Sequence, residues 1–151
     1  MLRNQLNTAM KEAMKAGDKE KLLTIRLILA NIKQKDIDGR TSGGQDSLSD
    51  TQILQLLQTM VKQRKESIQM FEKAGRDDLV QKETTEIQVI ESFLPKQMDE
   101  GAIKSAIQTL IDDLKVTSPK DMGKVMAALK DQYAGQMDFG KASQMVKQLL
   151  T

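Results

Sequence analysis

Lysine side chains are the residues of this chain that are best suited to bind a charged ligand. Lys62 and Lys65 are three residues apart, which places them one turn apart if the segment is helical. A second set lies in the last third of the chain and consists of Lys124, Lys130, Lys141 and Lys147. Lysine contacts to phosphate position proteins on nucleic acids. The two sets therefore suggest a phosphate-backbone interface, although ordinary surface lysines would give the same pattern.

Two of these lysines are expected near helix starts, where backbone N–H groups favour anions. Lys124 follows Ser118-Pro119, which is a typical N-cap followed by proline at the first helical position. Lys141 follows Asp138, another good N-cap. Only four aromatic residues occur in the chain, so base stacking of the kind found in single-strand binders is not expected. Phosphate contact is the chemistry that this set of residues supports.

Catalytic residues are much harder to find. Cysteine and histidine are absent, which excludes disulfides, a cysteine nucleophile and a Ser-His-Asp triad. Acidic pairs occur at Asp36/Asp38, Asp77/Asp78 and Asp112/Asp113. Neighbouring residues on a helix point in different directions, and acidic residues are common at helix N-termini. We expect no catalytic residue, no metal site and no cofactor.

Apolar residues recur at helical spacing through most of the chain and predict an all-α protein. Helices are expected from the N-terminus to about residue 16, from Asp18 to about Asp38, from Ser49 to Ala74, and from an Asp77 cap to Leu94. The second helix has an unusually broad apolar surface, because Leu23, Leu27 and Ala30 widen the stripe of Leu22, Ile25, Leu29 and Ile32. This breadth predicts contacts on two sides of that helix.

Pro95 interrupts the helical pattern, because proline breaks helices and disfavours helical angles in the preceding residue. Three further helices are expected within residues 99–151. We therefore predict an N-terminal four-helix domain (residues 1–94), a hinge (residues 95–98) and a C-terminal three-helix bundle (residues 99–151). Phe93, Leu94 and Pro95 form the predicted joint.

The segment 39–46 (GRTSGGQD) is glycine-rich and polar but lacks the Gly-Lys-Ser/Thr ending of a P-loop, so we interpret it as a flexible linker. The net charge is only +2, so any nucleic-acid site must be a local cluster. The first residues do not form the apolar core of a signal peptide, and no apolar run of about 18 residues predicts a membrane span. We expect a cytoplasmic protein.

Four segments resemble the GatB/YqeY family: residues 10–16 (MKEAMKA), 71–79 (FEKAGRDDL), 86–95 (EIQVIESFLP) and 121–126 (DMGKVM). They are spread over nearly the whole chain, which is similar to a stand-alone YqeY-type protein. The resemblance implies a helical N-terminal domain and a three-helix tail. It also implies a functional setting, because the same domain forms the tail of the B subunit of glutamine-dependent aminoacyl-tRNA amidotransferases, where it recognises tRNA.

By this resemblance, Gly123 and Lys124 are the best candidates for RNA contact, and Gly135 and Lys141 match a later Gly-x-x-Asp-x-x-Lys-like segment. Gln136 follows Gly135, where the family often has a basic residue, so one phosphate contact is missing. Close packing between helices would explain Gly123 equally well.

The leading hypothesis is a non-catalytic accessory protein that binds tRNA or works with a tRNA amidotransferase. The alternative is a protein–protein interaction adaptor that uses the cleft between the two domains. A third hypothesis is an amidotransferase, that is, a carbon–nitrogen ligase with glutamine as amido donor, but no nucleophile or nucleotide site supports it. The expected partners are therefore tRNA or another protein, and no membrane.

Overall fold

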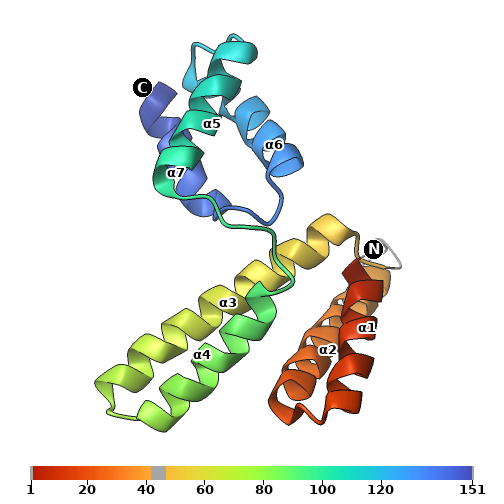
Figure 1. The fold of residues 1–151 in the computed structure, drawn as a ribbon. Helices are drawn as coiled ribbons and strands as arrows, with labels where there is room; N and C mark the ends of the chain where they lie inside the picture. Colours follow the sequence, from red (N-terminus) through yellow and green to blue (C-terminus); the bar gives the residue numbers. More distant parts are fainter. Residues whose placement is uncertain (1, 42–46, 151) are drawn as a thin grey trace. The chain divides into compact units, whose positions relative to one another are not determined.

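The computed structural model describes residues 2–41 and 47–150, and every regular element among them is helical. Four helices come first: α1 (Leu2–Ala16), α2 (Lys19–Thr41), α3 (Asp50–Lys73) and α4 (Asp77–Glu91). Then follow α5 (Glu100–Asp113), the short 3₁₀ helix η1 (Pro119–Asp121), α6 (Met122–Gln132) and α7 (Phe139–Leu150). The prediction of an all-α protein with four and then three α-helices is confirmed (Figure 1).

Contacts within the chain divide it into two compact units, Met1–Leu94 and Pro95–Thr151. The boundary falls at the proline that the sequence singled out. Each unit has its own hydrophobic core and is described by itself. The assignment of these units to separate domains joined by a hinge at 95–98 stays a prediction.

The first unit consists of two helical hairpins, α1–α2 and α3–α4, which meet mainly where α2 packs on α4 (Figure 1). Gly17 and Gly75 end the first helix of each hairpin with a φ of +70°, which glycine adopts without a Cβ penalty. The core contains fully buried side chains from all four helices: Leu6, Ile28, Ile32, Ile53, Leu57 and Ile90. These side chains belong to one cluster, which joins the two hairpins.

The helix ends of this unit follow the sequence signals in part. Ser49 caps α3 as expected, since its Oγ accepts the N–H of Gln52 at 3.3 Å while the Gln52 Oε1 accepts the N–H of Ser49 at 2.9 Å. The cap position of α4 is Arg76, so Asp77 is already the first helical residue. Helix α2 runs to Thr41 and includes the start of the predicted linker, because a glycine near a helix end costs only about 1 kcal/mol. The rest of that linker, residues 42–46, lies outside the described residues.

The second unit packs α5, α6 and α7 around one core. The fully buried side chains are Ile107, Val125, Leu129 and Val146, with Met137 from the turn before α7. As predicted, Ser118 caps the helical segment that starts at Pro119, but this segment is a single 3₁₀ turn, and α6 begins at Met122. The Ser118 Oγ accepts the N–H of Lys120 at 3.3 Å.

The predicted joint is attached at both ends. Phe93 and Leu94 pack against the core of the first unit. On the other side of Pro95, the Met98 N–H donates to the Gln136 carbonyl at 2.9 Å, and the Gln97 Nε2 donates to the Gly135 carbonyl at 2.6 Å. Both of these bonds lie within the second unit. The Gln97 Nε2 also donates to the Pro95 carbonyl at 3.0 Å, so Gln97 links Pro95 to the turn at Gly135.

Candidate nucleic-acid interface

The predicted lysines of the second unit are exposed, but they do not share one face. Lys124 and Lys130 belong to α6, and Lys141 and Lys147 belong to α7. Each pair is six residues apart, which turns the side chains about 120° away from each other on an α-helix. The structure therefore separates the set into single lysines on several faces.

The two helix starts that were expected to bind phosphate already hold acidic side chains. Asp121 lies 3.9 Å from the ammonium of Lys124, whose side chain is 74% exposed. Asp138 Oδ1 accepts the N–H of Gly140 at 2.8 Å at the start of α7. A carboxylate at a helix N-terminus repels a second anion. These helix starts are therefore weaker phosphate sites than the sequence suggested, and the lysine side chains themselves are the stronger candidates.

A groove between α5 and α7 brings Lys141 together with a lysine that the sequence did not single out. Lys104 of α5 lies across this groove of about 490 Å³ from α7. The remaining lining residues are Glu100, Gln144, Met145, Gln148 and Leu149. Two ammonium groups, two amide side chains, one carboxylate and two apolar side chains thus line one surface. Such a surface can contact phosphates, hydrogen-bond to a ribose or base edge, and pack against a base.

Part of this groove could be predicted from the sequence. Lys141, Gln144 and Gln148 follow the i, i+3, i+7 spacing of one helix face, which marks a polar stripe. The role of Lys104 could not be predicted from the sequence, because this residue becomes a neighbour of that stripe only when α5 packs on α7. Spacing within one helix cannot predict such a contact.

The two glycines of the interface differ in their structural roles. A Cβ atom added at Gly123 would meet no atom within 4 Å. Close helix packing therefore does not explain this glycine. Gly135 has a φ of +77° in the turn before α7, and its carbonyl accepts the bond from Gln97. Backbone geometry is thus a sufficient reason for Gly135, whereas Gly123 lies open on the surface of α6.

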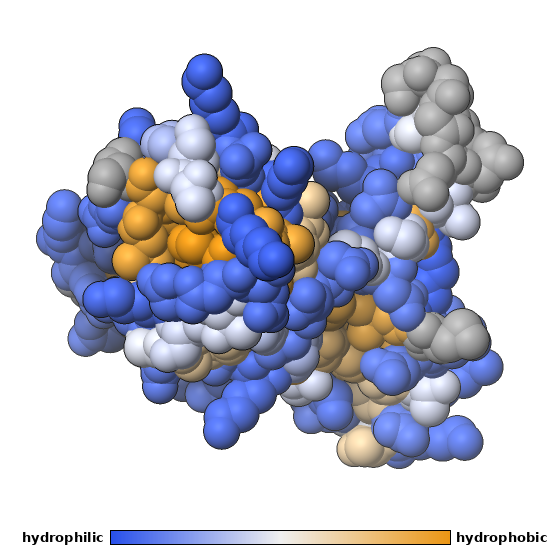
Figure 2. All heavy atoms as spheres, turned by 90° about the horizontal axis from the view of Figure 1, so that it is seen from above, coloured by the Kyte–Doolittle hydropathy of each residue, from blue (hydrophilic) through white to orange (hydrophobic). Residues whose placement is uncertain are grey.

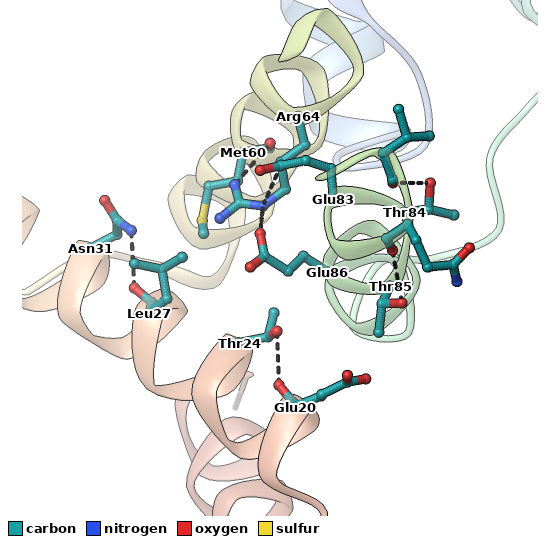
Figure 3. A network of polar contacts seen from close by, with 12 residues as sticks. Glu20, Thr24, Leu27, Asn31, Met60, Arg64, Glu83, Thr84, Thr85 and Glu86 are labelled. Atoms are coloured by element: carbon teal, nitrogen blue, oxygen red, sulfur yellow. Dashed lines mark hydrogen bonds and ion pairs between the residues drawn. The ribbon is translucent and has the colours of Figure 1, made fainter. Parts of the chain in front are cut away.

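The basic cluster of the first unit divides into two parts. Lys62 and Lys65 are exposed on α3 and form no ion pair within the described part of the chain. Arg64, which lies between them, turns inward and bonds to Glu86 of α4 through its Nε at 3.0 Å (Figure 3). Lys62 and Lys65 are about 60° apart around the helix, so they can form one small positive patch.

Glu83 completes the polar cluster around Arg64. Its Oε2 lies 3.9 Å from the Arg64 Nε, beyond the closer Glu86 (Figure 3). Burial raises the pKa of the Glu83 carboxyl above its ordinary value, and the charge of Glu86 adds to this rise, while Arg64 opposes it. Two carboxylates thus compete for one guanidinium. This arrangement is a structural contact between α3 and α4, not an open site.

The other acidic pairs have structural partners or lie apart. Arg76 holds Asp78 with two bonds, Nε to Oδ1 at 3.1 Å and NH2 to Oδ2 at 3.0 Å, which lowers the pKa of the Asp78 carboxyl. Asp112 accepts a bond from Gln108 at 3.1 Å. Among the described residues, no group of three or more acidic side chains is arranged to hold a metal ion.

Figure 2 shows mainly hydrophilic side chains at the surface, with smaller apolar patches between them. The largest exposed apolar side chains include Leu23, Leu27, Met70 and Leu114. Within residues 2–41 and 47–150, no helix is both long and apolar enough to cross a bilayer.

Together, these features define a small all-helical protein with two cores and a set of surface lysines. The chain belongs to the YqeY-like protein family, whose model matches residues 3–150. The resemblance of the four sequence segments is thereby confirmed.

Fungal proteins are among its relatives. "Altered inheritance of mitochondria protein 41, mitochondrial" from Lachancea thermotolerans is 33% identical over 144 residues, which are 94% of this chain and 75% of that protein. The protein of the same name from Clavispora lusitaniae is 30% identical, over 99% of this chain and 85% of its own length. The one from Eremothecium gossypii is 44% identical, over 59% and 46%. The matched regions thus range from about half to most of the relatives' length.

The cytoplasmic location expected from the sequence is contradicted by these relatives, because their names assign them to mitochondria. The expectation rested on the absence of a signal-peptide pattern and of a membrane-spanning run. These absences do not distinguish the cytoplasm from the interior of an organelle.

Proposed function

We propose that this protein is a non-catalytic RNA-binding accessory factor and that tRNA is its RNA. The groove between α5 and α7 carries this proposal, because it places Lys104 and Lys141 from two different helices along one surface. The family also supports it, since the resemblance of residues 121–126 and of the Gly135–Lys141 pattern is to a tRNA-recognition tail.

The groove has the groups that an RNA backbone needs. The two ammonium groups would contact neighbouring phosphates, and the amide of Gln144 would hydrogen-bond to a 2′-hydroxyl or a base edge. Glu100 lines the same groove and would repel phosphate at one end. The backbone is therefore proposed to run along the α7 side, next to Lys141.

The remaining lysines would extend the contact rather than specify it. Lys130 and Lys147 are exposed and form no ion pair within the described residues, while Lys124 is partly neutralised by Asp121. Lys62 and Lys65 belong to the first unit and would form a second, separate phosphate contact. Gly123 would allow close approach of the RNA to α6, because no side chain covers the backbone there.

Titration of a fluorescent tRNA with the intact chain at two salt concentrations tests the proposal. Each phosphate contact should contribute a slope of roughly −0.7 to −0.9 in log K against log salt. The double variant Lys104→Glu/Lys141→Glu should weaken binding by at least about tenfold and reduce the slope by about 2. Absence of binding at low salt, with the helical circular dichroism spectrum intact, would show that the protein is not an RNA-binding protein.

A matched control separates the groove from the overall charge. The double variant Lys11→Glu/Lys35→Glu changes the net charge by the same amount. Both of its residues are exposed on α1 and α2 and lie outside the groove. It should alter affinity much less than the groove variant. An equal loss in both variants would contradict the groove and favour diffuse attraction. Glutamine-dependent amidation of a mischarged tRNA by the purified chain alone would contradict the accessory role.

A further inference from the structure

Helix α2 has apolar residues on two faces, and only one of them is covered. Ile25, Ile28 and Ile32 are completely buried in the core of the first unit. On the opposite side, Leu23 is 66% exposed and Leu27 is 41% exposed. Ala30 continues the same line and is also exposed. The sequence predicted contacts on two sides of this helix, and within the described residues of the first unit a partner packs on one of them.

The spacing of the exposed side indicates what kind of partner fits it. Positions 23, 27 and 30 follow the i, i+4, i+7 pattern of the seam by which two helices pack side by side. We call this line of residues the α2 seam. Apolar seams of this kind bind an amphipathic helix through its own heptad positions.

One edge of the α2 seam carries a row of positive charge. Lys19, Arg26 and Lys33 are seven residues apart and lie on the same side of the helix. All three are exposed, and none forms an ion pair with the described residues. In helix pairs, the charges next to the seam select the partner by its opposite charges.

The other edge is mostly occupied by bonds within α2. The Thr24 Oγ1 donates to the Glu20 carbonyl at 3.0 Å, and the Asn31 Nδ2 donates to the Leu27 carbonyl at 2.9 Å (Figure 3). Asp38 accepts a bond from Gln34 at 3.0 Å. The bond from Gln34 leaves the Asp38 carboxylate charged, so the two edges differ in sign, and the positive row is the edge that would attract acidic side chains.

We propose that the α2 seam is the docking site for an amphipathic helix of another protein, with leucine-like residues facing the seam and acidic residues facing Lys19, Arg26 and Lys33. A second copy of this chain fits less well. An antiparallel pair would oppose the two positive rows, and a parallel pair would offer only Asp38 opposite Lys33. An RNA backbone would match the charges but not the exposed leucines. The proposal is independent of RNA binding, because the groove lies in the other unit.

A synthetic peptide provides the probe. It is a helix-forming peptide of three heptads with leucine at the seam positions and glutamate at the flanking positions, and its matched control has lysine in place of glutamate. Fluorescence anisotropy with the full chain should show at least about tenfold tighter binding of the acidic peptide. Arg26→Glu/Lys33→Glu should reverse this preference, because it reverses the charge of the edge.

Surface variants locate the peptide on the chain. Leu23→Gln/Leu27→Gln should reduce acidic-peptide binding by at least about tenfold. Because both leucines are exposed, the variant should fold like the parent. Met70→Gln is the matched control, since Met70 of α3 is 71% exposed but lies outside the seam, and it should leave binding unchanged.

Three outcomes would overturn the proposal. Equal affinity for the acidic and the basic peptide would remove the role of the positive edge. Equal loss with Met70→Gln would indicate nonspecific apolar adhesion. A dimer in sedimentation that Leu23→Gln/Leu27→Gln dissociates would assign the seam to a second copy of the chain.

Discussion

Arg64 of α3 donates from its Nε to the Glu86 carboxylate of α4 at 3.0 Å, and this bond joins the two helices of one hairpin. The two side chains are only 12% and 20% exposed. Arg64 also donates from its NH1 to the Met60 carbonyl of its own helix at 3.2 Å. The most prominent basic cluster of the sequence is thus divided between an inward arginine and two outward lysines.

Removing one partner of this ion pair should destabilise the first unit. Arg64→Met leaves two half-buried carboxylates without their cation, so we expect a loss of about 1–3 kcal/mol in the free energy of unfolding. Glu86→Gln should cost less, because Arg64 keeps the Met60 carbonyl and the more distant Glu83. Urea denaturation followed by circular dichroism measures both losses.

Arg76→Met is the matched control for that experiment. Arg76 pairs with Asp78 at 3.0 Å, but both side chains are more than half exposed. Water screens the attraction between exposed charges, so this variant should change stability little. If Arg64→Met and Arg76→Met had equal effects, burial of the Arg64 contact would have no energetic importance.

Glu83→Gln should stabilise the protein near neutral pH. Because burial and the neighbouring Glu86 raise the pKa of the Glu83 carboxyl, the folded state binds its proton more tightly than the unfolded state does. The stability from this group is therefore complete at a pH below its ordinary pKa and is lost as the pH rises through the folded pKa. Glutamine does not ionise, so the variant carries no negative charge at this site at neutral pH.

Thermal unfolding at two pH values measures this difference. Glu83→Gln should raise the Tm at about pH 7 and should change it much less at about pH 4, where the parent carboxyl is largely protonated. A Tm that falls at neutral pH would mean that the attraction of Arg64 outweighs both the burial of Glu83 and the repulsion of Glu86.

The all-α class and the order of the helices followed from the sequence because they depend on local signals. Helical periodicity, the Ser49 cap and the proline break each act over a few residues. The apolar surface of α2 was also visible, including its second face. Periodicity could not predict that Leu23 and Leu27 are exposed, because exposure depends on how the helices pack against one another.

The candidate site was harder to predict from the sequence, because it is made of side chains from separate helices. Lys141 was predicted, but its neighbour Lys104 follows from the packing of α5 against α7. The helix starts show a second limit of the sequence. It predicted Asp138 as a cap near Lys141, but it did not predict that Asp121 lies 3.9 Å from the Lys124 ammonium.

Gly123→Ala should stabilise the second unit. A glycine inside a helix costs about 0.5–1 kcal/mol relative to alanine, and a Cβ at this position meets no atom within 4 Å. Gly135→Ala should have the opposite effect, because a φ of +77° is unfavourable for a residue with a Cβ. Chemical denaturation of both variants compares them directly. A destabilising Gly123→Ala would restore close packing as the reason for this glycine.

Pro95→Ala should change the relative arrangement of the two units without unfolding either of them. Phe93 and Leu94 are fixed by the first core, and Gln97 and Met98 are fixed by bonds within the second unit. Alanine at position 95 removes proline's restriction of its own φ and of the backbone of Leu94, so the added freedom lies between these two attachments.

Small-angle scattering and circular dichroism together measure this effect. The scattering curve should change while the helical signal and the unfolding transition stay the same. Gln97→Ala is the companion variant, because it releases the bonds from the Gln97 side chain to the Pro95 and Gly135 carbonyls. It should shift the curve further when combined with Pro95→Ala. If neither variant alters the scattering, Pro95 only ends α4, and the packing of Phe93 and Leu94 sets the orientation.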